Sequence, residues 1–514
     1  MKKHLIIIIP VILLAILIFP GCEKQLDSKV YDQVTENNFF QTPQQVNATL
    51  AQAYTPMTGI QMPPGGSFIL NEVSTDELIV PTRGNDWYDG GKWQRYWTHT
   101  PLYTDADINI AWSSYASGTT ACNFVLNLLN SLPPANKPSN TAQITAEIKV
   151  LRAYYLLGLM DLFGNIPLVT DFNTVPSKVV QSTPSAVYAF LESELLTNVP
   201  LLQAPSAANY GHMTKYGGYM VLAHLYLNAQ VYTGTAEWTK ALSAADTVIN
   251  SGAYSLQPNY LDNFIVANQG SLENIFVIPF NNNYIGGNNW EAMTLHYSNM
   301  YTYNLTGQPD NGFCAPTAFY RSFTATDTRT KMWELGQQYS SSGAILTDLG
   351  TGLLCIISPY VLQLSNPADS FRLAGARSNK YAPQPGTNGM QSNSGVVYRL
   401  GEAYLIKAEA ELRLGDASDA LIAVNAIRAR AEVPAWGLSD LTLPNLLAER
   451  GREMAWENVR RDDLIRFEVA DKVPYFTGAR VPGKSQDPDQ HTFLFPIPQA
   501  QMNTNPNLKQ NTGY

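Results

Sequence analysis

Aromatic rings and polar side chains gather in one stretch of the chain, residues 72–100, which reads E-V-S-T-D-E-L-I-V-P-T-R-G-N-D-W-Y-D-G-G-K-W-Q-R-Y-W-T-H-T. Its glycines, Gly84, Gly90 and Gly91, predict a loop rather than a helix up to Thr100. A protein that binds sugars needs flat rings for their C–H faces and charged or amide groups for their hydroxyls. The candidate rings are Trp87, Tyr88, Trp93, Tyr96 and Trp97, and the candidate polar groups are Asp76, Arg83, Asn85, Asp86, Asp89 and Arg95. The alternative is that these rings only anchor a long loop to the body of the protein.

A second candidate cluster follows about 200 residues later. It comprises Asn288, Asn289, Trp290, His296, Tyr297, Tyr301 and Tyr303, and it precedes D-N-G-F-C-A-P-T-A-F-Y-R-S-F at 310–323. By contrast, Trp112 falls in a helical pattern, so we expect its ring in the core.

The sequence contains none of the motifs that would indicate an enzyme. H-E-x-x-H, G-x-S-x-G, a P-loop and a dinucleotide fingerprint are all absent, and the six histidines are scattered. Asp86 and Asp89 could serve a glycosidase only at a fixed separation across a cleft, which spacing in a loop does not establish. We therefore favour hydrogen bonding to hydroxyls and expect no catalysis and no cofactor.

Composition narrows the classes of partner. Charged residues make up 15% of the chain, against about 25% in ordinary soluble proteins. The net charge of −9 argues against binding to nucleic acid. After Cys22, the cysteines Cys122, Cys314 and Cys355 are odd in number and widely spaced, which favours free thiols over a bridge, and no C-x-x-C pair suggests a zinc site.

The N-terminus resembles a secretion signal. Lys2 and Lys3 precede an apolar run, Leu5 to Phe19, which is shorter than the roughly 20 residues that span a bilayer. Gly21 and Cys22 end the run as in a lipoprotein signal, so we expect residues 1–21 to be removed and Cys22 to be lipidated. The alternative is a plain membrane anchor with an incidental cysteine.

Helical periodicity predicts a mostly α-helical scaffold. Residues 396–414 predict one helix, Gly415 ends it, and Asp416 caps the next helix, 417–431. Ala408 and Ala420 lie twelve residues apart across this turn. Ala229 and Ala241 repeat the spacing within 216–249. Small residues at this spacing allow two successive helices to pack closely, as in tetratricopeptide repeats. Further helical stretches are 109–129, 144–163 and 443–467, the last as one long helix or a bent pair.

The scaffold is interrupted by two long insertions. We expect a single domain over 22–514, with helical repeats at about 106–251 and 396–470, insertions at about 61–105 and 254–395, and a C-terminal strap at 490–514. The second insertion is too long for a simple loop, and I-F-V-I-P-F at 275–280 is one strand candidate.

Several motifs, taken in order, resemble one family. They are E-I-K-V-L-R-A-Y-Y-L-L-G-L-M-D-L-F-G-N-I-P-L-V (147–169), Y-R-L-G-E-A-Y-L-I-K-A-E-A (398–410), E-R-G-R-E-M-A-W-E-N-V-R-R-D-D-L-I-R-F (449–467), and the closing F-P-I-P-Q and N-x-N-P-N-L-x-Q-N-x-G-Y. Together they resemble the SusD/RagB family of outer-membrane nutrient-binding lipoproteins. The resemblance implies four tetratricopeptide-like helix pairs that support an irregular ligand-binding half.

The resemblance also implies a function and a site. It implies a surface-exposed, lipid-anchored outer-membrane protein that binds an oligosaccharide and caps a SusC-like TonB-dependent transporter. The glycan site would lie among the two insertions, with Asn311 and Cys314 lining the pocket and Arg372 and Arg377 closing it. The alternatives are a peptide-capturing member of the same family and a protein-scaffolding repeat protein.

The charged residues of 449–466 have a structural interpretation. Glu449, Arg450, Arg452, Glu453, Arg460, Arg461, Asp462, Asp463 and Arg466 could be mistaken for a catalytic or phosphate-binding patch. On helices such residues form pairs three or four positions apart and tie neighbouring helices together. We expect the same role for Arg152.

Overall fold

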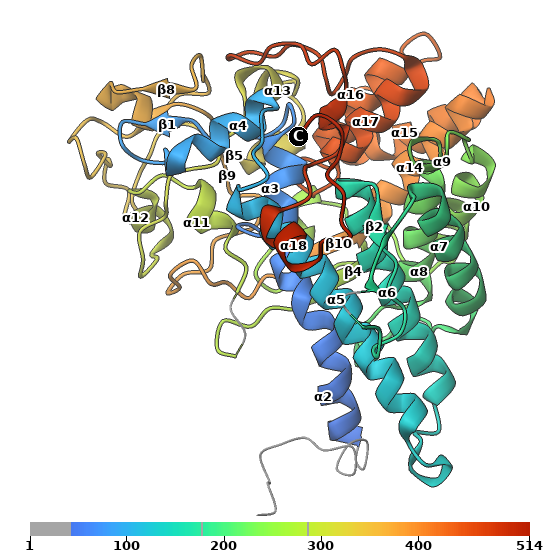
Figure 1. Ribbon diagram of the computed structural model, residues 1–514. Helices are drawn as coiled ribbons and strands as arrows, with labels where there is room; N and C mark the ends of the chain where they lie inside the picture. Colours follow the sequence, from blue (N-terminus) through green and yellow to red (C-terminus); the bar gives the residue numbers. More distant parts are fainter. Residues whose placement is uncertain (1–42, 176–177, 285–286) are drawn as a thin grey trace, which may run out of the picture.

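The computed structural model describes residues 43–175, 178–284 and 287–514 (Figure 1). The signal segment and Cys22 lie outside the described residues, so their predicted roles stay predictions. Within the described ranges, no helix has both the length and the apolar character needed to cross a bilayer.

Helices form the right and lower parts of the molecule in Figure 1. Neighbouring helices pack as pairs, notably α5 with α6, α8 with α10 and α14 with α15. The bounds of the main helices are α2 (Pro43–Tyr54), α3 (Gly66–Val73), α5 (Ala106–Ser131), α6 (Thr141–Phe163), α7 (Pro184–Asn198), α8 (Lys215–Leu227), α9 (Ala229–Thr233), α10 (Trp238–Ile249), α14 (Leu400–Leu414), α15 (Ala417–Arg430), α16 (Leu443–Glu453) and α17 (Arg460–Asp471). The mostly helical fold expected from the sequence is confirmed.

The turn between α14 and α15 agrees with its prediction in detail. Gly415 has a φ of 91° at the end of α14, a left-handed conformation that glycine adopts without steric cost. The Asp416 side chain accepts a hydrogen bond from the Asp419 backbone N–H and caps α15. Ala408 and Ala420 are fully buried, so the two helices approach closely.

Two predicted element assignments were wrong. Residues 395–399 form strand β10 (Gly395–Arg399) and not the start of a helix, because they pair antiparallel with β4 (Asn274–Ile278). For the stretch 443–467, the expected alternative of a pair of helices is confirmed, because α16 and α17 are separated at residues 454–459. Within the expected loop, Lys92–Thr98 forms helix α4. The strand expected at 275–280 is confirmed as β4.

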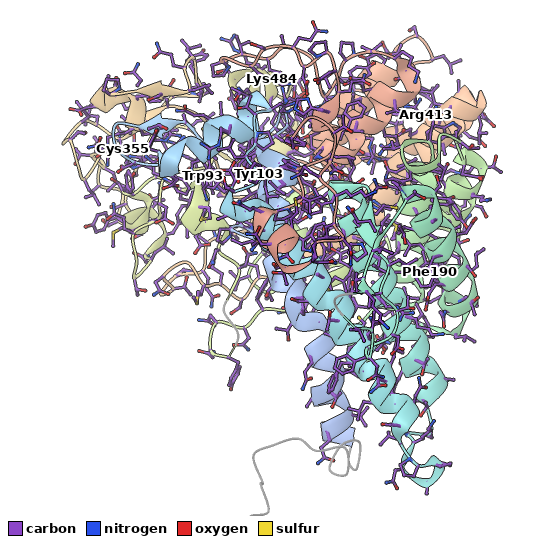
Figure 2. The ribbon with its side chains drawn as sticks, in the orientation of Figure 1. Trp93, Tyr103, Phe190, Cys355, Arg413 and Lys484 are labelled. Carbon is purple, nitrogen blue, oxygen red and sulfur yellow. The ribbon has the colours of Figure 1, made fainter. Side chains whose placement is uncertain are left out.

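Irregular chain fills the left half of Figure 1, where much of both insertions lies. Its helices and strands are short, including α11 (Trp290–Thr294), α12 (Asn299–Tyr303), α13 (Thr317–Arg321), β1 (Thr82–Arg83), β6 (Gly336–Gln337), β7 (Ile356–Ile357), β8 (Ser365–Asn366) and β9 (Arg377–Ser378). Trp93 and Cys355 lie in this left half, whereas Phe190 and Arg413 lie in the helical right half (Figure 2). Cys122, Cys314 and Cys355 are free and buried, as the favoured interpretation expected.

Buried ion pairs join the helices of the C-terminal half. Glu449 and Glu453 of α16 each accept hydrogen bonds from several arginines, and Arg450 pairs with Asp463 at 2.7 Å. Such pairs must be well partnered, because an unpaired buried charge is strongly unfavourable. Arg152 likewise pairs with Glu194 at 2.8 Å. The structural interpretation of these charges is confirmed.

The C-terminal strap lies across the end of α6. The Asn511 side chain donates hydrogen bonds to the carbonyls of Phe163 and Phe495, at 3.0 and 2.7 Å. The Tyr514 hydroxyl donates to the Leu494 carbonyl at 2.9 Å. These bonds hold the C-terminal strap against the helical scaffold.

Candidate functional site

Four predicted ring residues are buried. Trp93, Trp97 and Trp290 are only 3%, 1% and 2% exposed, and Tyr96 is 1% exposed. The Trp93 indole donates to Asp89 at 2.7 Å, and that of Trp97 donates to the Pro482 carbonyl at 2.6 Å. These four rings are therefore part of the core, and we correct their assignment as ligand-binding rings. Trp112 is buried, as expected.

Two predicted arginines hold loops together. Arg83 is fully buried and donates to the carbonyls of Phe371 and Ala374, at 3.0 and 2.6 Å. Arg377 is also fully buried. One of its outer nitrogens donates a hydrogen bond to the Ala374 carbonyl, and the other donates to the Asn311 side chain. Burial lowers the pKa of Arg377 to about 9. Neither guanidinium is available to a ligand in this structure, and their assignment is corrected.

The assignment of Cys314 is corrected for a similar reason, whereas Asp76 is paired with an arginine but its side chain is still 38% exposed. The Asp76 carboxylate lies 2.7 Å from Arg460. Burial raises the pKa of Asp76, but the Arg460 guanidinium more than offsets this and holds that pKa below its ordinary value. Cys314 is fully buried, and its thiol accepts a hydrogen bond from Arg83 at 3.3 Å.

An exposed group remains where residues 84–91, which we call the site loop, meet the second insertion. Asp86 is fixed on one oxygen by two donors, the Tyr297 hydroxyl at 2.5 Å and the Arg372 guanidinium at 2.8 Å. The Asp86 side chain is still 42% exposed. Tyr88 is 58% exposed and Tyr301 46%. We call these five residues the front site.

The electrostatics of the front site follow from this packing. The Arg372 guanidinium lies 4.6 Å from the centre of the Tyr297 ring and also donates to Asp348 at 2.9 Å. Burial and the hydrogen bond to Asp86 raise the pKa of Tyr297 to about 12, so its hydroxyl stays protonated and donates. Burial lowers the pKa of Arg372, but its carboxylate partners raise it above the ordinary value. The site thus presents one fixed carboxylate and one fixed cation, and the same two segments carry the exposed rings of Tyr88 and Tyr301.

Backbone strain marks the site loop. Trp87 and Asp89 have φ values of 62° and 41°, a region that residues other than glycine seldom adopt. The Trp87 ring rests on Trp93 and Phe313, and its indole donates to the Asp310 carbonyl at 2.6 Å. The loop is therefore held in one conformation by its own aromatic side chains, as ligand-binding loops often are.

Sequence reasoning missed Asp348, which supports the front site from beneath. Asp348 is 1% exposed and lies 3.1 Å from His296 as well as 2.9 Å from Arg372. A signal was available, because Asp348 is the only charged residue between Leu335 and Leu364. A lone charge in such a stretch indicates a buried partner.

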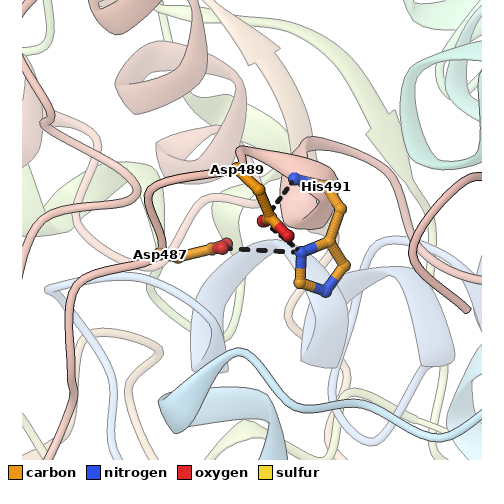
Figure 3. A group of neighbouring side chains, drawn as sticks. All are labelled: Asp487, Asp489 and His491. Atoms are coloured by element: carbon orange, nitrogen blue, oxygen red, sulfur yellow. Dashed lines mark hydrogen bonds and ion pairs between the residues drawn. The ribbon is translucent and has the colours of Figure 1, made fainter.

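One group of side chains in the described residues could supply several metal ligands. Asp487, Asp489 and His491 bring their ligand atoms within 4.8 Å of one another (Figure 3). The His491 ring nitrogen lies 2.6 Å from Asp489 and 3.5 Å from Asp487, and the ring packs against Tyr514. These contacts explain why the three side chains lie together: they hold the loop of residues 485–491 against the C-terminal strap.

Comparisons with known proteins cover nearly the whole chain. The model of the SusD family matches residues 228–514, and a model described as starch-binding associating with outer membrane matches residues 24–227. Starch-binding protein SusD of Bacteroides thetaiotaomicron is 25% identical over 87% of this chain and 85% of its own length. SusD-like protein P25 of Formosa agariphila is 24% identical over 75% of this chain and 76% of its own.

Solved structures share the fold. Surface glycan-binding protein A from Bacteroides uniformis superposes with a TM-score of 0.74 at 20% identity, covering 91% of this chain and 99% of that one. The protein of the same name from Bacteroides thetaiotaomicron, solved in complex with laminarihexaose, gives 0.71 at 21% identity, with coverage of 91% and 99%. Because the family model alone matches more than half of the sequence, this chain belongs to the SusD family.

Proposed function

We propose that this protein is a non-catalytic, surface-exposed lipoprotein of the outer membrane that binds an oligosaccharide at the front site. It would pass the ligand to a SusC-like TonB-dependent transporter. The observation that carries the proposal is the combination of a fixed carboxylate, Asp86, with the exposed rings of Tyr88 and Tyr301. Such rings stack on the C–H faces of sugars, while Asp86 and Arg372 reach hydroxyls.

Two relatives support the ligand class. One is named for starch binding, and one was solved with laminarihexaose. Asp86 and Asp89 each have a different structural partner, so we propose that they bind and position rather than cleave. We further propose lipidation of Cys22, which mass spectrometry of the mature N-terminus would test.

The test is isothermal titration of the soluble form, beginning at Glu23, with a panel of oligosaccharides and peptides. Saturable binding of a saccharide is expected. Tyr88→Ala and Tyr301→Ala should each weaken binding about tenfold, because a lost stacking contact costs roughly 1–2 kcal/mol. Tyr284→Ala removes a ring that is 85% exposed on a different loop and serves as the matched control.

The outcomes separate the candidate functions. Saccharide binding that survives in both site variants would place the ligand elsewhere. Binding of peptides alone would establish the peptide-capturing alternative. Failure to bind any member of either panel would contradict the proposal and favour a scaffolding role.

A further inference from the structure

A polar cavity lies on the helical side of the molecule, away from the front site. It opens between residues 322–327, which follow α13, and the loop 431–442, which joins α15 to α16. In Figure 1, α15 and α16 lie at the upper right, whereas α4 and α12 of the front half lie at the left. Its volume is about 250 Å³, slightly below the roughly 300–1,000 Å³ of drug-sized sites. We call it the rear cavity.

A half-buried tryptophan with a fixed backbone forms one wall. The Trp436 backbone N–H donates to the Asn425 side chain at 2.8 Å, and the same side chain donates back to the Trp436 carbonyl at 3.0 Å. The Arg428 guanidinium lies 4.5 Å from the centre of the Trp436 ring and donates twice to the Pro434 carbonyl. The indole is therefore positioned before any ligand arrives, which reduces the entropy lost on binding.

Polar groups surround this ring. Asp440, Asn445 and Thr324 line the cavity and are exposed. The hydroxyl oxygen of Ser322 is buried, and within the described residues it has no hydrogen-bond partner. A buried polar atom without a partner is unusual in a folded protein and is satisfied when a ligand or water reaches it.

The charges of the rear cavity favour a neutral ligand. Arg428 and Arg452 both pair with the buried carboxylate of Glu449, at 2.7 and 2.6 Å. Arg452 also donates to the Ser322 carbonyl at 3.3 Å. Asp440 adds a negative charge at the rim, so no cationic excess remains to hold a phosphate or sulfate.

We propose that the rear cavity is a second saccharide-binding site, which holds one or two rings of a neutral glycan against Trp436. Asp440, Asn445 and Thr324 would bind its hydroxyls. The proposal takes its ligand class from the proposed function but assigns a separate site. A glycan held at both sites, or two glycans held at once, would be retained longer than at either site alone.

The test labels the protein with 6-fluorotryptophan and follows fluorine resonances on titration with laminarihexaose and, separately, maltohexaose. Trp436→Phe identifies the Trp436 resonance by its loss. The titration is run in Tyr88→Ala/Tyr301→Ala, where the front site is impaired. We expect the Trp436 resonance to shift saturably with at least one glucan, and Asn445→Ala, which leaves the ring in place, to weaken that response several-fold.

Two outcomes would overturn the inference. One is a Trp436 resonance that does not move at millimolar saccharide, and the other is a resonance that responds to inorganic phosphate but to neither glucan. Calorimetry on Trp436→Ala, which has no ring in the rear cavity, reports the front site independently. If calorimetry detects saccharide binding at the front site but the Trp436 resonance does not shift, only the rear site is rejected. If the Trp436 resonance shifts but calorimetry detects no binding at the front site, only the front site is rejected.

Discussion

Trp93 links the site loop to the core, so we expect its replacement to lower the stability of the protein rather than its affinity for a ligand. Its side chain is 3% exposed, and the centre of its ring lies 5.5 Å from that of Trp87 and 5.8 Å from that of Phe313. We expect Trp93→Ala to lower the free energy of unfolding by about 3–5 kcal/mol, as for other large-to-small core changes. Urea denaturation would measure it. Tyr88→Ala, at an exposed ring of the same loop, should stay within about 0.5 kcal/mol of the wild type. If Trp93→Ala kept its stability and lost only its affinity for a ligand, the original prediction that the Trp93 ring binds ligand would be correct.

Glu291 should make stability depend on pH. Its carboxyl is fully buried, and one oxygen has no partner within the described residues, so burial raises its pKa to about 8. Unfolded, the same group has a pKa of about 4.3. Between these values the folded state keeps a proton that the unfolded state has lost, so rising pH favours unfolding by about 1.4 kcal/mol per pH unit. Above pH 8 the effect is constant.

The measurement compares Glu291→Gln with the wild type by chemical denaturation from pH 5 to pH 8. The neutral amide has no proton to lose, so the variant should gain stability relative to the wild type as pH rises through this window. Glu432→Gln, at an exposed position, is the control and should follow the wild-type slope. Identical slopes for all three proteins would show that Glu291 is ionised in the folded state.

Residue types alone predicted part of the front site. Tyr88, Asp86 and Tyr301 were identified from composition and spacing, and the structure leaves all three exposed. Their role stays a prediction. The tryptophans were misjudged because the neighbouring glycines indicated a loop. Trp93 and Trp97 are four residues apart, a spacing that places both on one face of a helix and signals burial.

At the scale of elements, the α14–α15 turn depends on one side chain. The Asp416 carboxylate satisfies an N–H at the start of α15 that has no partner within the helix. We expect Asp416→Ala to lower the free energy of unfolding by about 1 kcal/mol. Thermal or urea denaturation would measure it. Ser418→Ala, exposed two positions further on, is the control and should change little. Equal effects of the two substitutions would mean that the cap is not what stabilises this helix end.

Helices were easier to predict than strands for a physical reason. Helical periodicity and caps are local, so α15 and its cap could be derived from a short window. β10 could not, because its partner β4 lies about 120 residues earlier and the pairing appears only after folding. The bonds of Arg83 to the second insertion and the bond of Arg377 to Asn311 are non-local in the same way, which is why both side chains were taken for ligand residues.

On the scale of the whole molecule, one apolar surface is left uncovered by the elements of the described residues. Three short segments of residues 336–357, the outer ribbon, are joined by backbone hydrogen bonds among Gln338, Leu346 and Cys355. These three residues are buried, whereas alternate positions face outward. The outward set is Tyr339, Ile345, Leu354 and Ile356, exposed by 49%, 61%, 53% and 48%. Small antiparallel sheets normally present polar side chains to water, so an apolar outer face indicates a protein partner.

The outer ribbon also adjoins the front site, because Asp348 within it bonds to Arg372. A partner that receives the ligand would therefore contact both surfaces at once. On the proposed function this partner is the SusC-like transporter, and the ribbon's aliphatic side chains suit a protein surface better than a sugar. Docking would bury them at about 25 cal/mol per Å², whereas a carboxylate placed there would have to lose its hydration.

We therefore expect Ile345→Glu/Leu354→Glu to lose co-purification with the transporter when both proteins are expressed in the same cells. Titration of the soluble variant should give unchanged saccharide affinity, because neither side chain belongs to the front site. Ile422→Glu places the same charge at a 69% exposed position on α15 and should leave co-purification intact. Retention of the transporter by the double variant would exclude the ribbon as the docking surface. Loss of saccharide affinity together with the transporter would instead mean that the charges had disturbed Asp348 and its contact with Arg372.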